Sequence, residues 1–217
     1  MIGNEILAIV IGYLLGSIPS AYIAARVVKG KDIRQIGSSN IGAVNTFREV
    51  GIKAGLAVTI TDIGKGTAAV AIAYWLLDVS QLFVLAAALA AIVGHNWMVF
   101  LKFSGGKGMA TTIGALAILM PLYGYWAGLL IFFVIIAMPL IITRNIALSL
   151  AIGLVSLPFI TWLGMKSGPF IAWSIVIGIL IGLKFLPTAR AAWAKAENKR
   201  DFFFERRQRN KDKKEGI

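Results

Sequence analysis

The sequence predicts an all-α, polytopic membrane protein with about seven transmembrane helices, and three observations support this fold class. Hydrophobic residues make up 58% of the 217-residue chain, and the mean hydropathy of +0.80 lies above that of soluble domains. The apolar residues form stretches long enough to cross a bilayer. Lysine and arginine gather at alternate ends of these stretches, as in membrane proteins of defined orientation.

The predicted spans follow from the thickness of the membrane, because a hydrocarbon core of about 30 Å takes about 20 helical residues. They cover residues 5–27, 54–77, 80–102, 109–122, 125–142, 146–163 and 168–186. The first is expected to be a retained span, because Glu5 stands where a signal peptide has basic residues and no clear cleavage site follows. Pro121 and the Tyr123-Gly124 pair separate the fourth span from the fifth, since residues 109–142 would otherwise form one overlong helix.

Two of the spans contain polar groups that a lipid-facing helix does not tolerate. The first carries Gly16-Ser17-Ile18-Pro19-Ser20, which frees backbone carbonyls and adds hydroxyls. A wet cavity and close helix packing through small residues explain this segment equally well. The second carries Asp62 and Lys65, which share one helical face because they are three residues apart. They can neutralise each other, and a structural ion pair and a direct ligand contact both remain open.

The basic residues also predict the orientation and the limits of the membrane domain. They are concentrated after the first, third and fifth spans and in the tail, so the N-terminus is expected outside and the C-terminus in the cytoplasm. We expect a transmembrane domain over residues 1–187 and a basic, amphipathic cytoplasmic tail over residues 188–217. In that tail, Trp193 and Phe202–Phe204 are expected on a surface helix, followed by a disordered end from Asn210.

The loop after the first span carries a candidate anion site. Its sequence is Gly37-Ser38-Ser39-Asn40-Ile41-Gly42-Ala43-Val44-Asn45-Thr46, and Arg48 follows it. Small residues, amides and hydroxyls can form a backbone nest that donates several N–H groups to one phosphate, and the arginine can add a forked, charge-assisted contact. Turn-forming composition alone also predicts such a loop. The arginine and the position at the membrane face favour ligand binding.

A second candidate anion site lies at the end of the third span. There Gly94-His95-Asn96-Trp97-Met98-Val99-Phe100 precedes Ser104-Gly105-Gly106-Lys107-Gly108. The glycines let backbone N–H groups and the lysine ammonium approach a phosphate closely, because no Cβ stands in the way. The spacing is not that of a Walker A motif, so nucleotide hydrolysis has no support. His95 is the only histidine in the chain, and both a catalytic base and a hydrogen-bonded packing residue remain open for it.

Composition excludes several classes of function. The absence of cysteine excludes disulfide frameworks, thiolate metal sites and cysteine nucleophiles. The net charge of +12 belongs to residues at span ends and in the tail, where it fits an anionic leaflet better than nucleic acid. An enzyme with phosphate-bearing substrates, an anion or phosphate-ester transporter and a structural membrane subunit remain. A transporter should show internal repeats, and the surroundings of the two glycine-rich loops are not similar to each other.

At these motifs the chain resembles the bacterial acyl-phosphate:glycerol-3-phosphate acyltransferase family of integral membrane proteins. Three segments match the family in order, and the likeness covers nearly all of residues 1–187. They are Gly16-Ser17-Ile18-Pro19-Ser20, Gly37-Ser38-Ser39-Asn40-Ile41-Gly42-Ala43-Val44-Asn45, and Gly94-His95 leading to Val99-Phe100-Leu101 and Gly105-Gly106-Lys107-Gly108. The resemblance implies a seven-helix fold with the site at the cytoplasmic face of the bacterial inner (plasma) membrane.

The resemblance implies transfer of a fatty acyl group from acyl phosphate to the sn-1 hydroxyl of glycerol 3-phosphate. The products would be lysophosphatidate and phosphate, in the first committed step of phospholipid synthesis. Membrane lipids and the enzyme that forms acyl phosphate are the implied partners, with no nucleic acid, cofactor or metal. Acyl phosphate is already activated, so positioning and charge stabilisation can suffice. Soluble-headed acyltransferases with a His and an Asp four residues apart are excluded, because no aspartate follows His95 at that spacing.

The matched motifs also imply which residues form the site. The implied catalytic residues are Lys107, Ser38, Asn45 and His95. The implied substrate-binding residues are Ser38, Asn40, Asn45, Arg48, Gly105, Gly106, Lys107, Gly108 and Arg144. The chain departs from the family pattern in four places: Ser39 replaces a glycine, Met98 a proline and Ser104 a lysine, and Ala147 stands where a hydroxyl-bearing residue is usual after Arg144.

Overall fold

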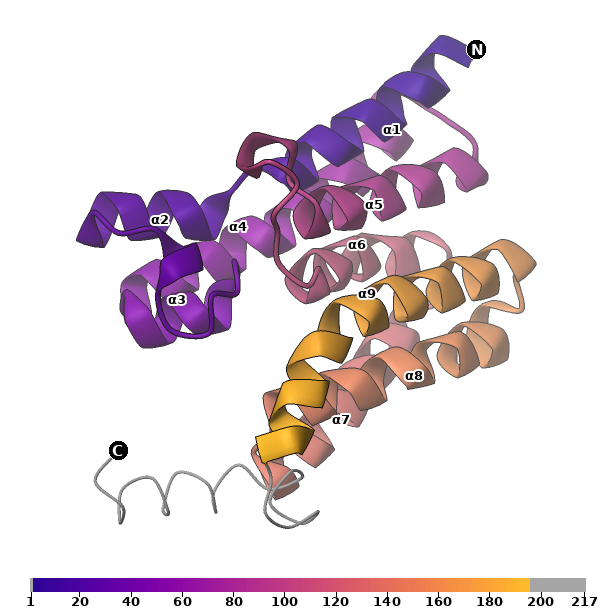
Figure 1. Ribbon diagram of the computed structural model, residues 1–217. Helices are drawn as coiled ribbons and strands as arrows, with labels where there is room; N and C mark the ends of the chain where they lie inside the picture. Colours follow the sequence, from indigo (N-terminus) through magenta and orange to yellow (C-terminus); the bar gives the residue numbers. More distant parts are fainter. Residues whose placement is uncertain (1, 196–217) are drawn as a thin grey trace. The chain divides into compact units, whose positions relative to one another are not determined.

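A computed structural model describes residues 2–195 of the protein, which are helical apart from their connecting loops (Figure 1). The helices belong to two compact units, residues 1–123 and 124–217. The first unit contains α1 (Ile2–Ser17), α2 (Ser20–Lys29), α3 (Ala43–Glu49), α4 (Ile52–Ala71), α5 (Gln81–Asn96) and α6 (Met109–Leu122). The second contains α7 (Trp126–Thr143), α8 (Ile146–Met165) and α9 (Gly168–Lys195).

Close backbone contact holds the first unit together. In Figure 1, α1 runs along α5, and α4 packs against α6. A Cβ added at Gly16 of α1 would collide with the carbonyl oxygen of Ala91 in α5, and one at Gly114 of α6 would collide with that of Ile63 in α4. Small residues let helix backbones approach this closely, which is a common way for apolar helices to associate where lipid replaces water. These glycines therefore fix the distance between paired helices.

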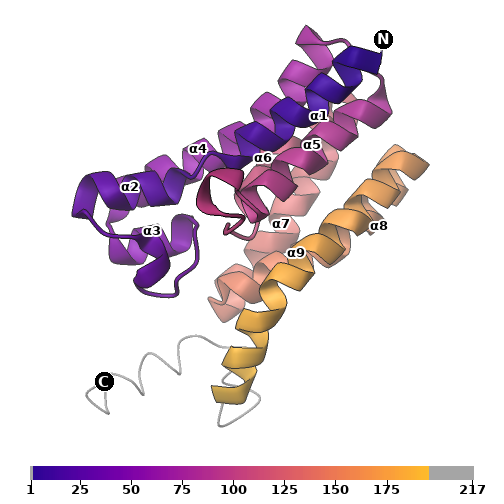
Figure 2. The ribbon, with the colours of Figure 1, turned by 45° about the horizontal axis from the view of Figure 1, so that its top comes forward.

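The first predicted span is two helices and not one. α1 ends at Ser17, α2 begins at Ser20, and Ile18-Pro19 lies between them. Proline has no N–H group and disfavours helical geometry in the residue before it, so Pro19 explains the break. Beyond it, α2, α3 and the loop between them lie at the end of this unit that is farthest from the N-terminus, as Figures 1 and 2 both show.

The other predicted spans each contain a helix, but two of these helices are short. Five segments of residues 2–195 are long and apolar enough to cross a membrane: Ile2–Lys29, Ile52–Leu76, Trp126–Thr143, Ile146–Met165 and Gly168–Ala191. α5 has 16 residues and α6 has 14. The span expected over 80–102 thus ends as an α-helix at Asn96, and a 3-10 turn follows at Val99–Leu101. Seven spans and the orientation of the termini stay predictions.

The second unit consists of three helices in sequence. α7 packs against α8, and α8 packs against α9. Thr161 of α8 and Ser174 of α9 share a buried hydrogen bond of 3.3 Å between their hydroxyl groups. α9 continues past Pro187 to Lys195. The expected surface segment at Phe202–Phe204 and the disordered end from Asn210 lie outside the described residues, so the division after residue 187 stays a prediction.

Candidate active site

The loop between α2 and α3 is organised by the side chain of Asn45, which is 2% exposed. Its Oδ1 accepts a hydrogen bond of 3.0 Å from the backbone N–H of Ser38. Its Nδ2 lies 3.1 Å from the carbonyl oxygens of Ile36 and Asn40 and 3.4 Å from that of Ile33. Both ends of the amide are thus used within the loop. Asn45 therefore sets the shape of the loop through these hydrogen bonds to backbone groups.

Of the other polar residues predicted here, Ser38 and Arg48 are exposed and Asn40 is half-buried. Arg48 belongs to α3 and follows Asn45 by three residues, which places it about one helical turn farther along. Gly37, before Ser38, has a left-handed φ of +58°, and a Cβ there would collide with Asn45 and Glu49. The Ser38 hydroxyl and the Arg48 guanidinium accordingly lie at the surface, while the Asn45 amide is buried.

An ion-pair cluster fastens the start of this loop to α2. Asp32 is 6% exposed, and one of its oxygens lies 2.7 Å from Nη2 of Arg34 and 3.8 Å from Nη2 of Arg26. The hydrogen bond from the Arg34 side chain lowers the pKa of Asp32 below its ordinary value. Both guanidinium groups also lie over the ring of Tyr22, at 5.3 and 5.5 Å from its centre. The loop is therefore anchored on its α2 side.

The glycine-rich loop meets this first loop at Gly106. The N–H of Gly106 donates a hydrogen bond of 3.0 Å to the carbonyl oxygen of His95. A Cβ at Gly106 would collide with Nε2 of His95 and would lie 2.6 Å from the carbonyl oxygen of Ile41. Residues of the second and third glycine-rich segments of the sequence thus converge at one point. No other residue type fits at position 106 without displacing one of these neighbours.

Lys107 and the start of α6 come directly after that point. Lys107 is half-buried, and burial lowers its pKa below the ordinary value of a lysine. Gly108 has a φ of +78°, and its carbonyl oxygen accepts bonds of 2.9 Å from both the N–H and the hydroxyl of Thr112. This arrangement places a lysine beside glycine N–H groups at the first turn of a helix, where partial positive charge favours anions.

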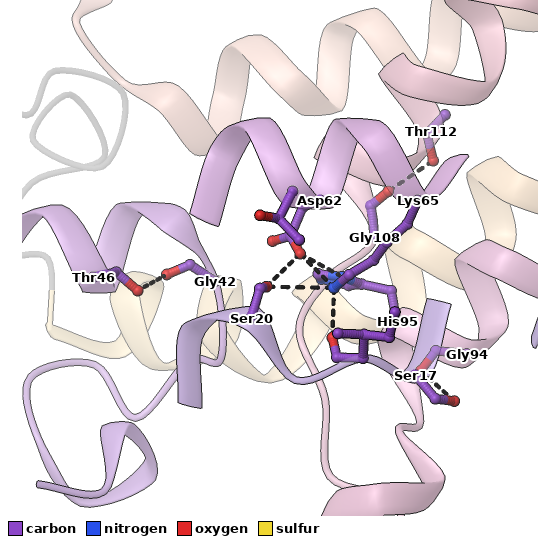
Figure 3. A network of polar contacts seen from close by, with 12 residues as sticks. Ser17, Ser20, Gly42, Thr46, Asp62, Lys65, Gly94, His95, Gly108 and Thr112 are labelled. Carbon is purple, nitrogen blue, oxygen red and sulfur yellow. Dashed lines mark hydrogen bonds and ion pairs between the residues drawn. The ribbon is translucent and has the colours of Figure 1, made fainter. Parts of the chain in front are cut away.

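Beneath the loops lies a buried polar network that joins three segments (Figure 3). Oδ1 of Asp62 accepts hydrogen bonds of 2.6 Å from both Oγ of Ser20 and Nζ of Lys65. The same Nζ donates a bond of 2.5 Å to the carbonyl oxygen of Ile18, at the break between α1 and α2. Nδ1 of His95 lies 3.6 Å from Oδ1 of Asp62. The structure confirms an ion pair between Asp62 and Lys65 and uses the backbone carbonyl that Pro19 was expected to free.

Comparison with known proteins identifies the family. The model of the family described as glycerol-3-phosphate acyltransferase matches residues 6–195 of the chain. Glycerol-3-phosphate acyltransferase 1 of Dehalococcoides mccartyi is 45% identical over 195 residues, which cover 90% of this chain and 94% of the relative. The chain belongs to the glycerol-3-phosphate acyltransferase family. The resemblance seen in the sequence motifs is thereby confirmed.

Other members of the glycerol-3-phosphate acyltransferase family agree with this assignment. Glycerol-3-phosphate acyltransferase 2 of Moorella thermoacetica is 39% identical, over 89% of this chain and 96% of its own. Among solved structures, the integral membrane glycerol 3-phosphate acyltransferase PlsY in its glycerol 3-phosphate form aligns with a TM-score of 0.80 and 28% identity, over 89% of this chain and 94% of that chain. The same protein in its lysophosphatidic acid form gives a TM-score of 0.71. This membership favours acyl transfer over the transporter alternative.

The sequence of this acyltransferase did not reveal that His95 lies near Asp62. An aspartate was sought four residues after the histidine, whereas the structure supplies Asp62 from another helix, 33 positions earlier in the chain. The mid-span carboxylate and the Pro19-Ser20 step were noted, but a sequence alone does not show that they meet. Arg144, also predicted for substrate binding, is the C-cap residue after α7 in the second compact unit and has a left-handed φ of +56°. Its role in the site stays a prediction.

Proposed function

We propose that this glycerol-3-phosphate acyltransferase transfers a fatty acyl group from acyl phosphate to the sn-1 hydroxyl of glycerol 3-phosphate. The products are 1-acyl-glycerol 3-phosphate and inorganic phosphate, and the reaction belongs to phospholipid synthesis. The meeting of the two anion-binding loops at Gly106 is the observation that carries this proposal. A reaction between two phosphate-bearing substrates needs two such sites side by side, with enough positive charge to offset their repulsion.

Each loop then has its own substrate. The glycine N–H groups of residues 105–108 and the Lys107 ammonium bind the phosphate of the acyl donor. Ser38, Asn40 and Arg48 bind glycerol 3-phosphate, with Arg48 as the forked partner of its phosphate. Asn45 shapes the glycerol-phosphate loop through its backbone contacts. These roles agree with the exposure of Ser38 and Arg48 and with the burial of Asn45.

The chemistry requires no covalent intermediate on the enzyme. The glycerol hydroxyl oxygen attacks the acyl carbon, the bond from that carbon to the phosphate oxygen breaks, and the phosphate leaves with the hydroxyl proton. Lys107 and the loop N–H groups stabilise the negative charge that develops on the acyl oxygen and on the leaving phosphate. Holding the two substrates in contact supplies the rest of the acceleration. The enzyme acts at the cytoplasmic face of a bacterial inner membrane, where an enzyme that forms acyl phosphate supplies the donor.

A donor comparison tests this proposal. The purified protein in detergent or lipid mesophase is given glycerol 3-phosphate with either acyl phosphate or acyl-CoA of the same chain length. We expect 1-acyl-glycerol 3-phosphate from acyl phosphate alone, and phosphate release only when glycerol 3-phosphate is present. Equal or better use of acyl-CoA would contradict the proposed donor, and a 2-acyl product would contradict the proposed position. Phosphate release without glycerol 3-phosphate would contradict transfer to that acceptor.

A further inference from the structure

We infer that Ser20, Asp62 and Lys65 position the imidazole of His95, and that the placed imidazole in turn supports the glycine-rich loop and Lys107. These residues act on the acyl-transfer step without contacting substrate. The inference rests on the proposed function, since it assigns to that site a supporting layer of residues. It assigns a role to the buried ion pair between Asp62 and Lys65.

The burial of the cluster excludes direct contact with the substrates. Ser20 is 9% exposed, Asp62 1%, and Lys65 and His95 3% each. Buried ions are tolerated only where each is compensated by opposite charge and hydrogen bonds. Here the carboxylate and the ammonium meet at 2.6 Å, and the Ser20 hydroxyl and the Ile18 carbonyl supply further polar contacts. The cluster is thus an internal joint between the α1–α2 break and α4.

His95 connects that joint to the active loop. One edge of its ring faces the cluster, with Nδ1 at 3.6 Å from Oδ1 of Asp62. The other edge is covered by Gly106, because a Cβ there would collide with Nε2. The backbone of His95 also holds Gly106 through the 3.0 Å bond to its carbonyl oxygen. The imidazole therefore lies between the Asp62 carboxylate, at ion-pair distance, and the residue that precedes Lys107, as Figure 3 shows on the cluster side.

The same contacts argue against His95 as a general base. A histidine oriented by an aspartate at Nδ1 is the arrangement in which the opposite nitrogen removes a proton from a hydroxyl. That nitrogen, Nε2, must then be open to the hydroxyl. In this protein Gly106 lies against it, and the His95 residue is only 3% exposed. His95 is accordingly a positioning residue, and misplacement of Lys107 is the expected result of disturbing it.

A double-mutant cycle between Asp62 and His95 tests the inference. In the wild-type background, Asp62→Asn should lower kcat by a factor of about ten or more, with a KM for glycerol 3-phosphate changed less than about threefold, because alignment and not binding is disturbed. In a His95→Gln background, Asp62→Asn should lower kcat by less than about threefold, because residues that act through one another are not additive. An equal fall in both backgrounds would overturn the inference.

Ser20 provides a milder test that leaves the ion pair intact. Ser20→Ala removes the hydrogen bond to Asp62 and the 3.3 Å bond that the hydroxyl accepts from Lys65, and Ser20→Thr retains a hydroxyl. We expect Ser20→Ala to lower kcat and Ser20→Thr to restore most of it, while the KM for glycerol 3-phosphate stays near the wild-type value. Wild-type kcat in Ser20→Ala would overturn the inference even if Asp62→Asn does not fold. The inference would also be overturned if Ser20→Ala lowers kcat, Ser20→Thr does not restore it, and Ser20→Ala lowers kcat equally in the His95→Gln background.

Matched controls separate these outcomes from general damage. Asp78→Asn makes the same chemical change at an exposed turn between α4 and α5, and Ser156→Ala removes a hydroxyl that donates to the Gly153 carbonyl within α8. Both should retain wild-type kcat. The wild-type donor comparison decides the proposed function separately. If acyl-CoA proves to be the donor, the double-mutant cycle of Asp62 and His95 is measured with acyl-CoA. The proposed function and the proposed positioning role can then fail independently.

Discussion

Lys107 combines a positive charge with partial burial beside the point where the two loops meet. Lys107→Ala should lower kcat/KM by a factor of about 100 or more, since loss of one preorganised donor to the transition state typically costs about 3 kcal/mol. Lys53→Ala, at an exposed lysine that precedes no glycine-rich loop, is the control and should change kcat/KM by less than about twofold. Near-native activity in Lys107→Ala would mean that the loop is only a connector.

The environment of Lys107 also predicts a pH dependence. Burial disfavours the charged form and lowers the pKa of Lys107 below its ordinary value. As pH rises through this lowered pKa, the ammonium loses its proton and its attraction for phosphate, so kcat/KM should fall on the alkaline side. In Lys107→Arg the guanidinium stays charged, and the fall should move to higher pH. A pH profile that is the same in both proteins would exclude Lys107 as its cause.

Arg48 should tolerate replacement poorly because its planar fork, and not only its charge, is proposed to match a phosphate. Arg48→Lys is expected to raise the KM for glycerol 3-phosphate several-fold with a smaller change in kcat. Lys31→Arg in the preceding segment, also exposed, is the matched control and should leave KM unchanged. Steady-state kinetics with saturating acyl donor measure both. Equal effects of the two substitutions would remove Arg48 from the substrate site.

At the scale of helices, the sequence was sufficient to place each apolar stretch but not to locate every break. Apolar stretches predict α4 and α6 to α9, because lipid requires hydrophobic helices, and Pro121 with Tyr123-Gly124 was needed to separate α6 from α7. The split of the first span at Pro19 and the end of α5 at Asn96 were missed. Tertiary partners complete both features: the freed Ile18 carbonyl accepts a hydrogen bond from Nζ of Lys65 in another helix, and the residues after Asn96 form a turn before the glycine-rich loop.

In the candidate site, too, the sequence predicted the local motifs but not the contacts between residues that are distant in the chain. Local motifs identified the two loops and the residues within them, because glycine, amide and basic residues cluster in short segments. The link from Asp62 to His95 and the contact between Ile41 and Gly106 join residues far apart in the chain. No local pattern reports such pairs. The motif at Gly16-Ser17, explained equally well by packing or by a cavity, proved to include close packing of Gly16 on Ala91.

That packing predicts how sensitive the α1–α5 pair is to side-chain size. Gly16→Ala would place a methyl group against the carbonyl oxygen of Ala91, so the two helices must separate. We expect a loss of about 1–3 kcal/mol in stability, as for other overpacked contacts. Gly3→Ala lies on the same helix with open space around it and should not destabilise. Thermal unfolding in detergent compares the two, and equal midpoints would refute the close contact.

For the whole molecule, the distribution of basic residues predicts that the two termini lie on opposite sides of the membrane. Single cysteines introduced at Asn4 and Gly216 can be labelled directly, because the natural chain has no cysteine. Labelling of intact membranes should reach Asn4 from the outside and Gly216 from the cytoplasm. Reaction of both from the same side would show that the number of spans is even, and that the charge pattern does not set this topology.

The short α5 and α6 also bear on how a lipid substrate arrives. With 16 and 14 residues, they measure about 24 and 21 Å, less than a hydrocarbon core of about 30 Å. If both cross the bilayer, as the sequence predicts, the surrounding lipid must thin by several ångströms to match them. The glycine-rich loop that joins them then sits closer to the bilayer centre than the headgroups of the unthinned bilayer. A donor held in the leaflet by its acyl chain would reach the loop by lateral diffusion in two dimensions, without leaving the bilayer.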